Sequence, residues 1–138
     1  GFLGGVSGNA GLFANAHDVA MVYQMLLDSG TVNGTQYLSA ETCKLFTTKT
    51  SASGRRGLGF DKPVPSQPNI NPCSSMAPAE VYGHTGYTGT CCWVDPVNKL
   101  VYVFLSNRTY PDDGVNMLAR LSIRPKIQEV IYQSIVKK

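Results

Sequence analysis

The sequence lacks any apolar run close to the roughly 18 residues that a membrane-spanning helix needs. It also lacks the pattern of a signal peptide, in which a basic start precedes an apolar stretch and a small-residue cleavage site. We therefore expect no membrane segment in this chain. Because the chain begins at Gly1 and not at a methionine, we expect it to be a processed product or a piece of a longer protein.

Charge is also sparse, since only 15% of the residues are charged and the net charge is +3. Apart from Arg55-Arg56 and Lys137-Lys138, the basic residues are scattered along the chain. A nucleic-acid-binding surface requires a concentrated basic patch, so nucleic acid is excluded as a partner class. We interpret Arg55 and Arg56 as a solvated pair in a loop.

Metal-ligand spacing is missing as well. The four cysteines form no Cys-x-x-Cys pair, and the two histidines do not complete a zinc pattern. Gly-Gly-Val-Ser-Gly at residues 4–8 lacks the Gly-Lys-Ser/Thr ending of a phosphate-binding loop. Cys91 and Cys92 should point to opposite faces of a strand, which argues against a bond between them. We expect buried small cysteines, no metal and no organic cofactor.

The sequence does contain enough apolar material for a core, with 43% hydrophobic residues over 138 positions, the length of one domain or part of one. Aromatic and β-branched residues bounded by Gly, Pro and Asn predict strands near residues 82–87, 90–95 and 99–106, joined by hairpins. Residues 100–105 are apolar at nearly every position, which indicates a strand covered on both faces. The predicted fold class is α+β, an antiparallel sheet with flanking helices.

A first helix is predicted over residues 16–29. Asn15 can cap it, and Gly30 stands where a C-terminal cap belongs. A core stripe at helical spacing consists of Val19, Val22, Tyr23 and Leu26.

Capping residues and apolar spacing predict two further helices. Ser39 can cap a short helix with Leu45 and Phe46 on its apolar side. Pro125 fits the first position of a final helix that ends near residue 136. Its predicted apolar face consists of Ile127, Val130, Ile131 and Ile135.

The connections between these elements differ in character. Residues 57–60 look extended. Residues 63–78 are rich in proline, serine and asparagine, which predicts a long irregular connection. A loop of that length in a compact domain is more often a rim or a lid than a random coil.

Glycines punctuate the first predicted strand at positions 83, 86 and 89. A glycine weakens a strand, and the usual compensation is the close approach of another backbone or of a ligand. Period-two geometry places His84 and Gly86 on one face and Thr85 on the other. From the pattern alone, two interpretations stay open: a glycine-rich edge strand with a structural histidine, and a strand that contacts a ligand.

A family resemblance bears on this choice. Gly-His-Thr-Gly-Tyr-Thr-Gly-Thr at residues 83–90, Trp-Val-Asp-Pro at 93–96 and Val-Phe-Leu-Ser-Asn-Arg at 103–108 resemble the third motif and last strands of the serine β-lactamase-like family. That family includes class C β-lactamases, penicillin-binding proteins and related esterases and D-amino-acid peptidases. The resemblance extends upstream through residues 8–20 and 57–60, so it spans most of the chain in the right order.

The resemblance implies roles for four neighbouring residues. His84 stands where the family commonly has lysine, Thr85 and Gly86 match its Thr/Ser-Gly, and the backbone N–H of Tyr87 would be an oxyanion-hole donor. Asn9 is a weaker candidate for a substrate-binding residue in the cleft, beside the interpretation as a turn asparagine. A histidine of ordinary pKa, ~6.5, is mostly neutral at pH 7, so the change from lysine favours an esterase-like or peptidase-like member over a true β-lactamase.

We identify neither the family's nucleophile motif, Ser-x-x-Lys, nor its Tyr-x-Asn motif in this chain. We therefore interpret residues 1–138 as one segment, the C-terminal part of an incomplete β-lactamase/transpeptidase-like domain. Alone it should be inactive. In the parent, the resemblance implies acyl-enzyme chemistry on a small-molecule ester or amide, and a periplasmic or other extracytoplasmic location.

Two further expectations follow. The alternative function is a non-catalytic binding or structural module of the same fold appended to another enzyme such as a glycosidase, because the Ser-Asn-Arg-Thr-Tyr-Pro run at residues 106–111 and the final helix resemble that branch of the family. An incomplete sheet would also leave an apolar strand edge uncovered. We expect the isolated chain to self-associate through that surface.

Overall fold

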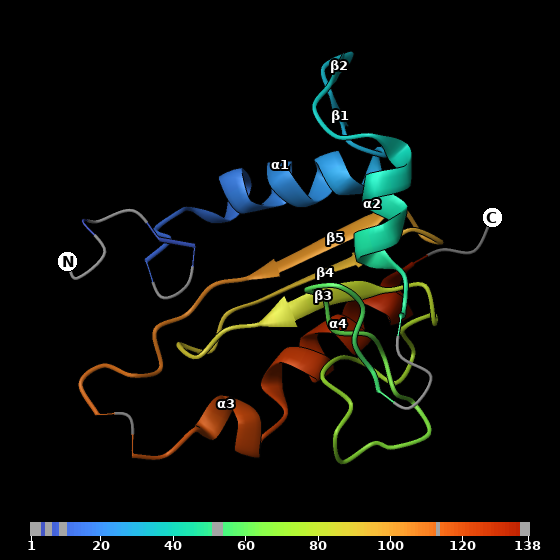
Figure 1. Cartoon of the computed structure of the whole chain (residues 1–138). Coiled ribbons are helices and arrows are strands. Elements are labelled where there is room, and N and C mark those ends of the chain that lie inside the picture. Colours follow the sequence, from blue (N-terminus) through green and yellow to red (C-terminus); the bar gives the residue numbers. More distant parts are fainter. Residues whose placement is uncertain (1–3, 5–6, 9–10, 51–53, 113, 136–138) are drawn as a thin grey trace.

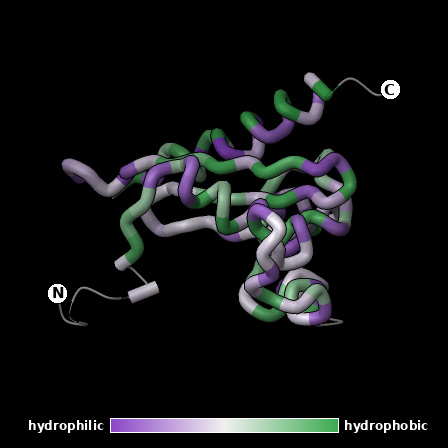
Figure 2. The backbone as a smooth tube through the Cα atoms, turned by 90° about the horizontal axis from the view of Figure 1, so that it is seen from above, coloured by the Kyte–Doolittle hydropathy of each residue, from purple (hydrophilic) through white to green (hydrophobic). Residues whose placement is uncertain are grey.

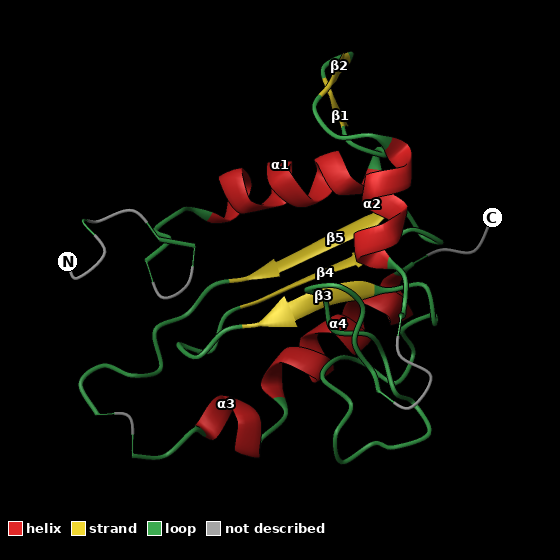
Figure 3. Cartoon of the chain, viewed as in Figure 1, coloured by secondary structure: helices red, strands yellow, loops and turns green. Residues whose placement is uncertain are grey.

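A computed structural model of the chain describes residues 4, 7–8, 11–50, 54–112 and 114–135 (Figure 1). Its centre is an antiparallel sheet of three strands, β3 (Tyr82–Thr85), β4 (Cys91–Asp95) and β5 (Leu100–Phe104), in the order β3-β4-β5. Helices lie on both faces of this sheet (Figure 3). The predicted α+β class and the predicted strand meander are confirmed.

The middle strand β4 is buried at every position, although its side chains alternate between the two faces. Trp93 and Cys91 form the main core cluster with Tyr102 of β5 and Tyr132 of the last helix. β5 is one of the two outer strands and is only partly buried, and Leu105 just beyond it is 40% exposed. The predicted cover of this strand on both faces is confirmed, since the first helix contacts β5 on one face and Leu100, Tyr102 and Phe104 pack with residues of the last helix on the other. The strand is nevertheless only half-buried, because it has a neighbouring strand on one side alone.

Helix α1 (Ala16–Leu27) covers one face and contacts β4 and β5 (Figure 1). Its predicted cap is confirmed, since Asn15 Oδ1 accepts a hydrogen bond of 3.0 Å from the Asp18 N–H. The predicted core stripe is wrong at Val22, which is 56% exposed, whereas the other three members are half-buried. The helix meets the sheet along the i, i+4, i+7 line through residues 19, 23 and 26, and position 22 lies on its flank.

Between α1 and α2 lies a small hairpin of β1 (Thr31–Val32) and β2 (Thr35–Gln36). Helix α2 (Ala40–Thr47) begins as predicted, with Ser39 Oγ accepting from the Thr42 N–H at 3.1 Å. Its apolar side is not the predicted one. Leu45 and Phe46 are 54% and 45% exposed, and Cys43 is the buried residue. Two residues rotate a helix by about 200°, so Cys43 and Leu45 face opposite ways.

The chain ends in two helices, α3 (Met117–Arg120) and α4 (Ile123–Ser134). α4 begins two residues before the predicted start, so Pro125 lies inside its first turn. Around α4, the helix that leads to the C-terminus, hydrophobic and hydrophilic residues alternate (Figure 2). Ile127, Ile131 and Ile135 pack on the core as predicted. Val130 is instead 60% exposed, and the inward face includes Gln128 and Tyr132.

Residues 57–60 form a bend and not an extended segment. Gly59 has φ +96°, and the Gly57 N–H donates to the Phe60 carbonyl at 3.0 Å. The bend brings Asp61 beside β3, where it exchanges two backbone hydrogen bonds with Gly83. Asp61 thereby reaches the outer edge of the strand that carries the His-Thr-Gly motif.

The long connection over residues 63–78 contains no helix or strand, as predicted. It is packed against the body of the protein. The buried Ser74 N–H donates a 2.9 Å bond to the Gln128 side chain of α4. The role of this loop as a rim or a lid stays a prediction.

Candidate active site

The His-Thr-Gly motif lies at the end of β3. His84 pairs with Cys92 and Thr85 with Cys91 across the ladder, so the two residues belong to opposite faces, as period-two geometry predicts. Both are half-buried, and residues 86–88 are exposed. The strand therefore emerges from the core at this motif.

Close neighbours within the protein explain why two positions of this segment are glycine. A Cβ on Gly83 would collide with the Cys92 carbonyl and the Trp93 ring, and one on Gly86 would collide with Thr90 Oγ1. At Gly83 the close neighbour is thus the adjacent strand and not a ligand. The Gly86 N–H donates to the Thr90 carbonyl at 2.8 Å, which closes the turn into β4.

Residues that follow β5 hold this turn. Arg108 Nε donates to the Tyr87 carbonyl at 2.8 Å, and its guanidinium lies 4.5 Å from the centre of the Tyr87 ring. Ser106 Oγ donates to the Thr88 carbonyl at 3.0 Å. A fixed turn suits the role predicted for the Tyr87 backbone N–H, because a donor that is already in place requires no reorganisation as charge develops.

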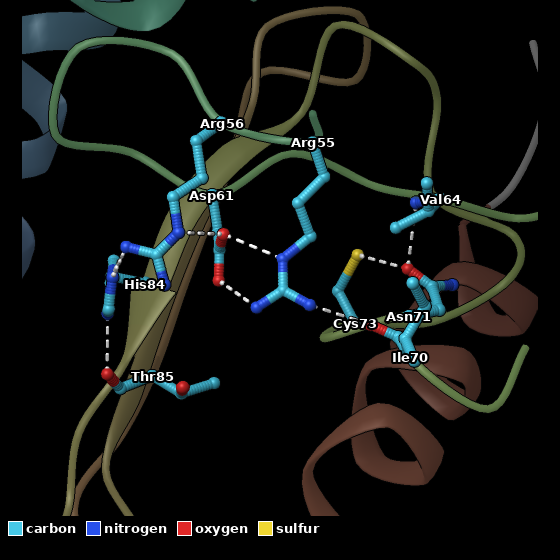
Figure 4. A network of polar contacts seen from close by, with 9 residues as sticks. All are labelled: Arg55, Arg56, Asp61, Val64, Ile70, Asn71, Cys73, His84 and Thr85. Atoms are coloured by element: carbon cyan, nitrogen blue, oxygen red, sulfur yellow. Dashed lines mark hydrogen bonds and ion pairs between the residues drawn. The ribbon is translucent and has the colours of Figure 1, made fainter. Parts of the chain in front are cut away.

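Both nitrogens of the His84 ring have protein partners (Figure 4). Nδ1 lies 2.6 Å from the Thr85 carbonyl oxygen, and Nε2 lies 3.2 Å from Arg56 Nη1. A carbonyl only accepts and a guanidinium only donates. We therefore assign the proton to Nδ1 and the acceptor lone pair to Nε2.

Arg56 belongs to an ion cluster around Asp61. Arg55 Nε and Nη2 bind the two Asp61 carboxylate oxygens at 2.9 and 3.1 Å, and Arg56 Nε lies 3.2 Å from Oδ1 (Figure 4). Asp61 is 1% exposed, and a buried carboxylate needs such partners. The interpretation of Arg55 and Arg56 as a solvated pair is wrong for Arg55, which is 31% exposed, and holds in part for Arg56, which is 57% exposed. Both bind a buried carboxylate, because the bend at residues 57–60 folds Asp61 back against them.

A buried lysine, Lys62, was also missed by sequence reasoning. It is 5% exposed, and its Nζ donates to the carbonyls of Thr47 and Glu80 at 3.1 and 2.7 Å. Burial lowers the pKa of its ammonium group. Because one bond goes to the last residue of α2 and the other to the segment just before β3, Lys62 joins these two parts of the fold and has a structural role.

The four cysteines are buried, as predicted, and none of them forms a disulfide in the structure. Burial raises the pKa of the Cys73 and Cys92 thiols to about 12 and that of Cys91 to about 11, so none of these three thiols is a ready nucleophile. Within the described ranges, no three His, Cys, Asp or Glu side chains are grouped so that they could hold a metal ion. Likewise, no helix in the described part of the chain is long and apolar enough to cross a bilayer.

Two sequence features remain. Asn9 lies outside the described residues. The expectation that the Ser-x-x-Lys spacing is missing from the chain is wrong, because Ser134 and Lys137 have that spacing, after His84 in the sequence. The Ser134 hydroxyl donates to the Val130 carbonyl at 2.8 Å on the last turn of α4, a common bond within a helix. This serine does not correspond to a nucleophile preceding the His-Thr-Gly strand.

An antiparallel sheet covered by helices, with His-Thr-Gly at the end of an outer strand, is the architecture of a β-lactamase/transpeptidase-like domain. The sequence model of the Beta-lactamase family matches residues 2–123. The chain therefore belongs to that family, and residue 134 lies beyond the matched region.

Similar curated proteins carry the name putative D-alanyl-D-alanine carboxypeptidase. Those of Escherichia coli O157:H7 and Escherichia coli K12 are 42% and 41% identical over 109 residues, and that of Salmonella agona is 36% identical over 115 residues. Each match covers 78% of this chain and 25% of the relative. The chain thus spans about a quarter of the length of the curated relatives it matches.

Proposed function

We propose that residues 1–138 are the C-terminal part of a serine hydrolase domain that cleaves ester or amide bonds through an acyl-enzyme. In this proposal the chain supplies the strand with His84, Thr85 and Gly86 and the oxyanion-hole N–H of Tyr87. The observation that carries the proposal is the emergence of His-Thr-Gly from a buried sheet into an exposed turn that Arg108 and Ser106 hold in place. One oxyanion-hole donor typically lowers a barrier by ~3 kcal/mol.

The substrate class that we propose follows from the name of the relatives, putative D-alanyl-D-alanine carboxypeptidase. We propose a small acyl compound of the D-alanyl peptide type, acted on outside the cytoplasm. Asn9 stays a candidate contact to that substrate.

The decisive experiment compares the full-length protein with the isolated 138-residue chain. Both are assayed with nitrocefin, a p-nitrophenyl ester and a peptide ending in D-alanyl-D-alanine, beside a boiled control. We expect turnover of at least one substrate by the full-length protein and none by the chain alone. Turnover by the purified chain alone would contradict the assignment as a part without its nucleophile.

The alternative, a non-catalytic module appended to another enzyme, has a different outcome in the same assay. A full-length protein that turns over none of these substrates, and that a fluorescent penicillin does not label, would support the module. The motif-level resemblance of residues 106–111 to such a branch is the observation that favours it.

A further inference from the structure

The turn between β3 and β4 contains the proposed oxyanion donor, the Tyr87 N–H, and is closed by two backbone hydrogen bonds. The Gly86 N–H donates to the Thr90 carbonyl at 2.8 Å, and the Gly89 N–H donates to the Gly86 carbonyl at 3.0 Å. A peptide unit is planar, so the Gly86 carbonyl and the Tyr87 N–H move together. The second bond therefore restrains the peptide unit that contains the donor.

The next two peptide units of the turn are held by residues that follow β5. The Tyr87 carbonyl accepts from Arg108 Nε at 2.8 Å. The Thr88 carbonyl accepts from the Arg108 backbone N–H and from Ser106 Oγ, both at 3.0 Å. Three consecutive carbonyls, those of residues 86–88, are thus hydrogen-bonded, and Arg108 provides a bond to two of them.

Arg108 also contacts the Tyr87 side chain. Its guanidinium carbon lies 4.5 Å from the centre of the ring, a distance typical of a cation–π contact. Tyr87 is 72% exposed and lies in a turn with Gly86 and Gly89, whose backbones adopt many conformations. The arginine therefore limits a freedom that the sequence of the turn would otherwise allow.

The sheet topology brings Arg108 to this turn. β3 and β5 are both antiparallel to β4, so both strands end at the same end of the sheet. The chain that follows β5 therefore lies beside the turn that follows β3 (Figure 1). Arg108 reaches Tyr87 although the two residues are 21 positions apart.

We propose that Arg108 is a positioning residue that keeps the Tyr87 N–H directed at the substrate oxygen, because it holds Tyr87 both at its carbonyl and at its ring. This inference rests on the proposed function, in which that N–H is an oxyanion-hole donor. Such a donor acts on the charge that develops in the transition state, so its displacement lowers kcat and leaves KM nearly unchanged. Ser106 holds Thr88, one residue farther along the turn.

The test uses the full-length protein and whichever of nitrocefin, the p-nitrophenyl ester and the D-alanyl-D-alanine peptide the wild type hydrolyses fastest. We expect Arg108→Met to lower kcat by about 10- to 100-fold, the loss expected when a donor is displaced, and to change KM by less than about 2-fold. Arg108→Lys should retain part of kcat, because it keeps the charge and loses the planar guanidinium.

Tyr87→Leu tests the contact with the ring separately, since it keeps the backbone N–H and carbonyl. We expect it to lower kcat by about 2- to 5-fold, which corresponds to one exposed cation–π contact. In the Arg108→Met background the same change should lower kcat no further, because the two side chains act as a pair.

Arg124→Met is the matched control. Arg124 Nη1 donates to the Thr90 carbonyl at 3.1 Å, so this variant removes an arginine bond from the last residue of the same turn. We expect a lower melting temperature and a kcat within about 2-fold of the wild type. An equal loss of kcat in Arg124→Met and Arg108→Met would overturn the proposal, and so would an unchanged kcat in Arg108→Met.

A thermal melt of each variant shows whether it folds. If Arg108→Met does not fold, Arg108→Lys and Tyr87→Leu decide: a lower kcat at constant KM in both supports the proposal, and an unchanged kcat in either overturns it. Failure of the proposed function is distinguishable, because a wild-type protein that hydrolyses none of the three substrates overturns both proposals. Wild-type turnover with an unchanged kcat in Arg108→Met overturns only the role of Arg108.

Discussion

His84 connects the proposed chemistry to the ion cluster, because its ring touches both the Thr85 carbonyl and Arg56. In the full-length protein we expect His84→Ala to lower kcat/KM by about 10-fold or more, since the strand that the proposed function places against the substrate loses the first side chain of its motif. The free energy of unfolding should change by less than about 1 kcal/mol, because the side chain is only half-buried.

Steady-state kinetics and a thermal melt on the same preparation measure both quantities. Unchanged kinetics with a lower melting temperature would mean that His84 is a structural strand residue.

The buried thiols predict a loss of stability at alkaline pH. Burial raises the pKa of Cys73 and Cys92 from 9.0 to about 12, so in that interval the unfolded chain has lost protons that the folded chain still holds. Their stabilising contribution is complete below pH ~9 and decreases as the pH rises, by up to ~1.4 kcal/mol per pH unit for each thiol. Urea unfolding between pH ~8 and ~10.5 measures the slope.

The ionisation of Lys62 changes the stability of the fold with pH in the opposite direction. Its folded-state pKa is lowered, so the cost of burying the ammonium falls as the pH rises toward 10.5. The variant Cys73→Ala keeps Lys62 and removes one thiol, so its stability should decrease less steeply with pH than that of the wild type. An identical slope in the two proteins would exclude Cys73 as a source of the effect.

At the scale of elements, the turn between β3 and β4 depends on Gly89. Its φ is +95°, and a Cβ there would lie 2.6 Å from Ser106 Oγ and also against the Leu118 side chain of α3. Gly89→Ala therefore combines backbone strain with overpacking, and we expect a loss of about 2 to 4 kcal/mol in the free energy of unfolding. Chemical denaturation measures it.

Gly59 provides the control, since its φ is +96° and a Cβ there would meet nothing within 4 Å. Gly59→Ala should lower the free energy of unfolding through backbone strain alone, by about 1 to 2 kcal/mol. Equal losses at the two positions would mean that packing of α3 and Ser106 against the turn is not what stabilises it.

At the scale of the whole molecule, the described residues leave one sheet edge and several large apolar side chains exposed. β5 is an outer strand of the sheet, Leu105 is 40% exposed, and Leu12 and Phe13 are 75% and 96% exposed. Unpaired strand edges and exposed apolar surface promote association between chains. We expect the isolated chain to self-associate at micromolar concentrations.

Light scattering across a dilution series measures the average mass directly. A monomer at high micromolar concentration that binds no dye for apolar surface would mean that these residues close their own core.

The sequence by itself determined the features whose causes are local. Turn residues and β-branched runs fixed the meander, and Asn15 and Ser39 marked the starts of α1 and α2, because a cap and a turn depend on neighbours within a few positions. The family motifs also placed His84 and Thr85 at the end of a strand. Which side of each helix faces the sheet was predicted only in part, as Val22, Leu45 and Val130 show, because apolar spacing does not reveal which flank meets a partner.

The ion cluster was decided only by the tertiary structure. Arg56 and His84 are 28 positions apart, and their contact depends on the bend at residues 57–60 and on the pairing of Asp61 with Gly83. The letters Arg-Arg fit a solvated loop equally well, since nothing local indicates that an aspartate five residues later is buried. The two arginines form an ion cluster because the fold buries the Asp61 carboxylate beside them. That burial depends on how the whole chain packs, so the local sequence does not reveal it.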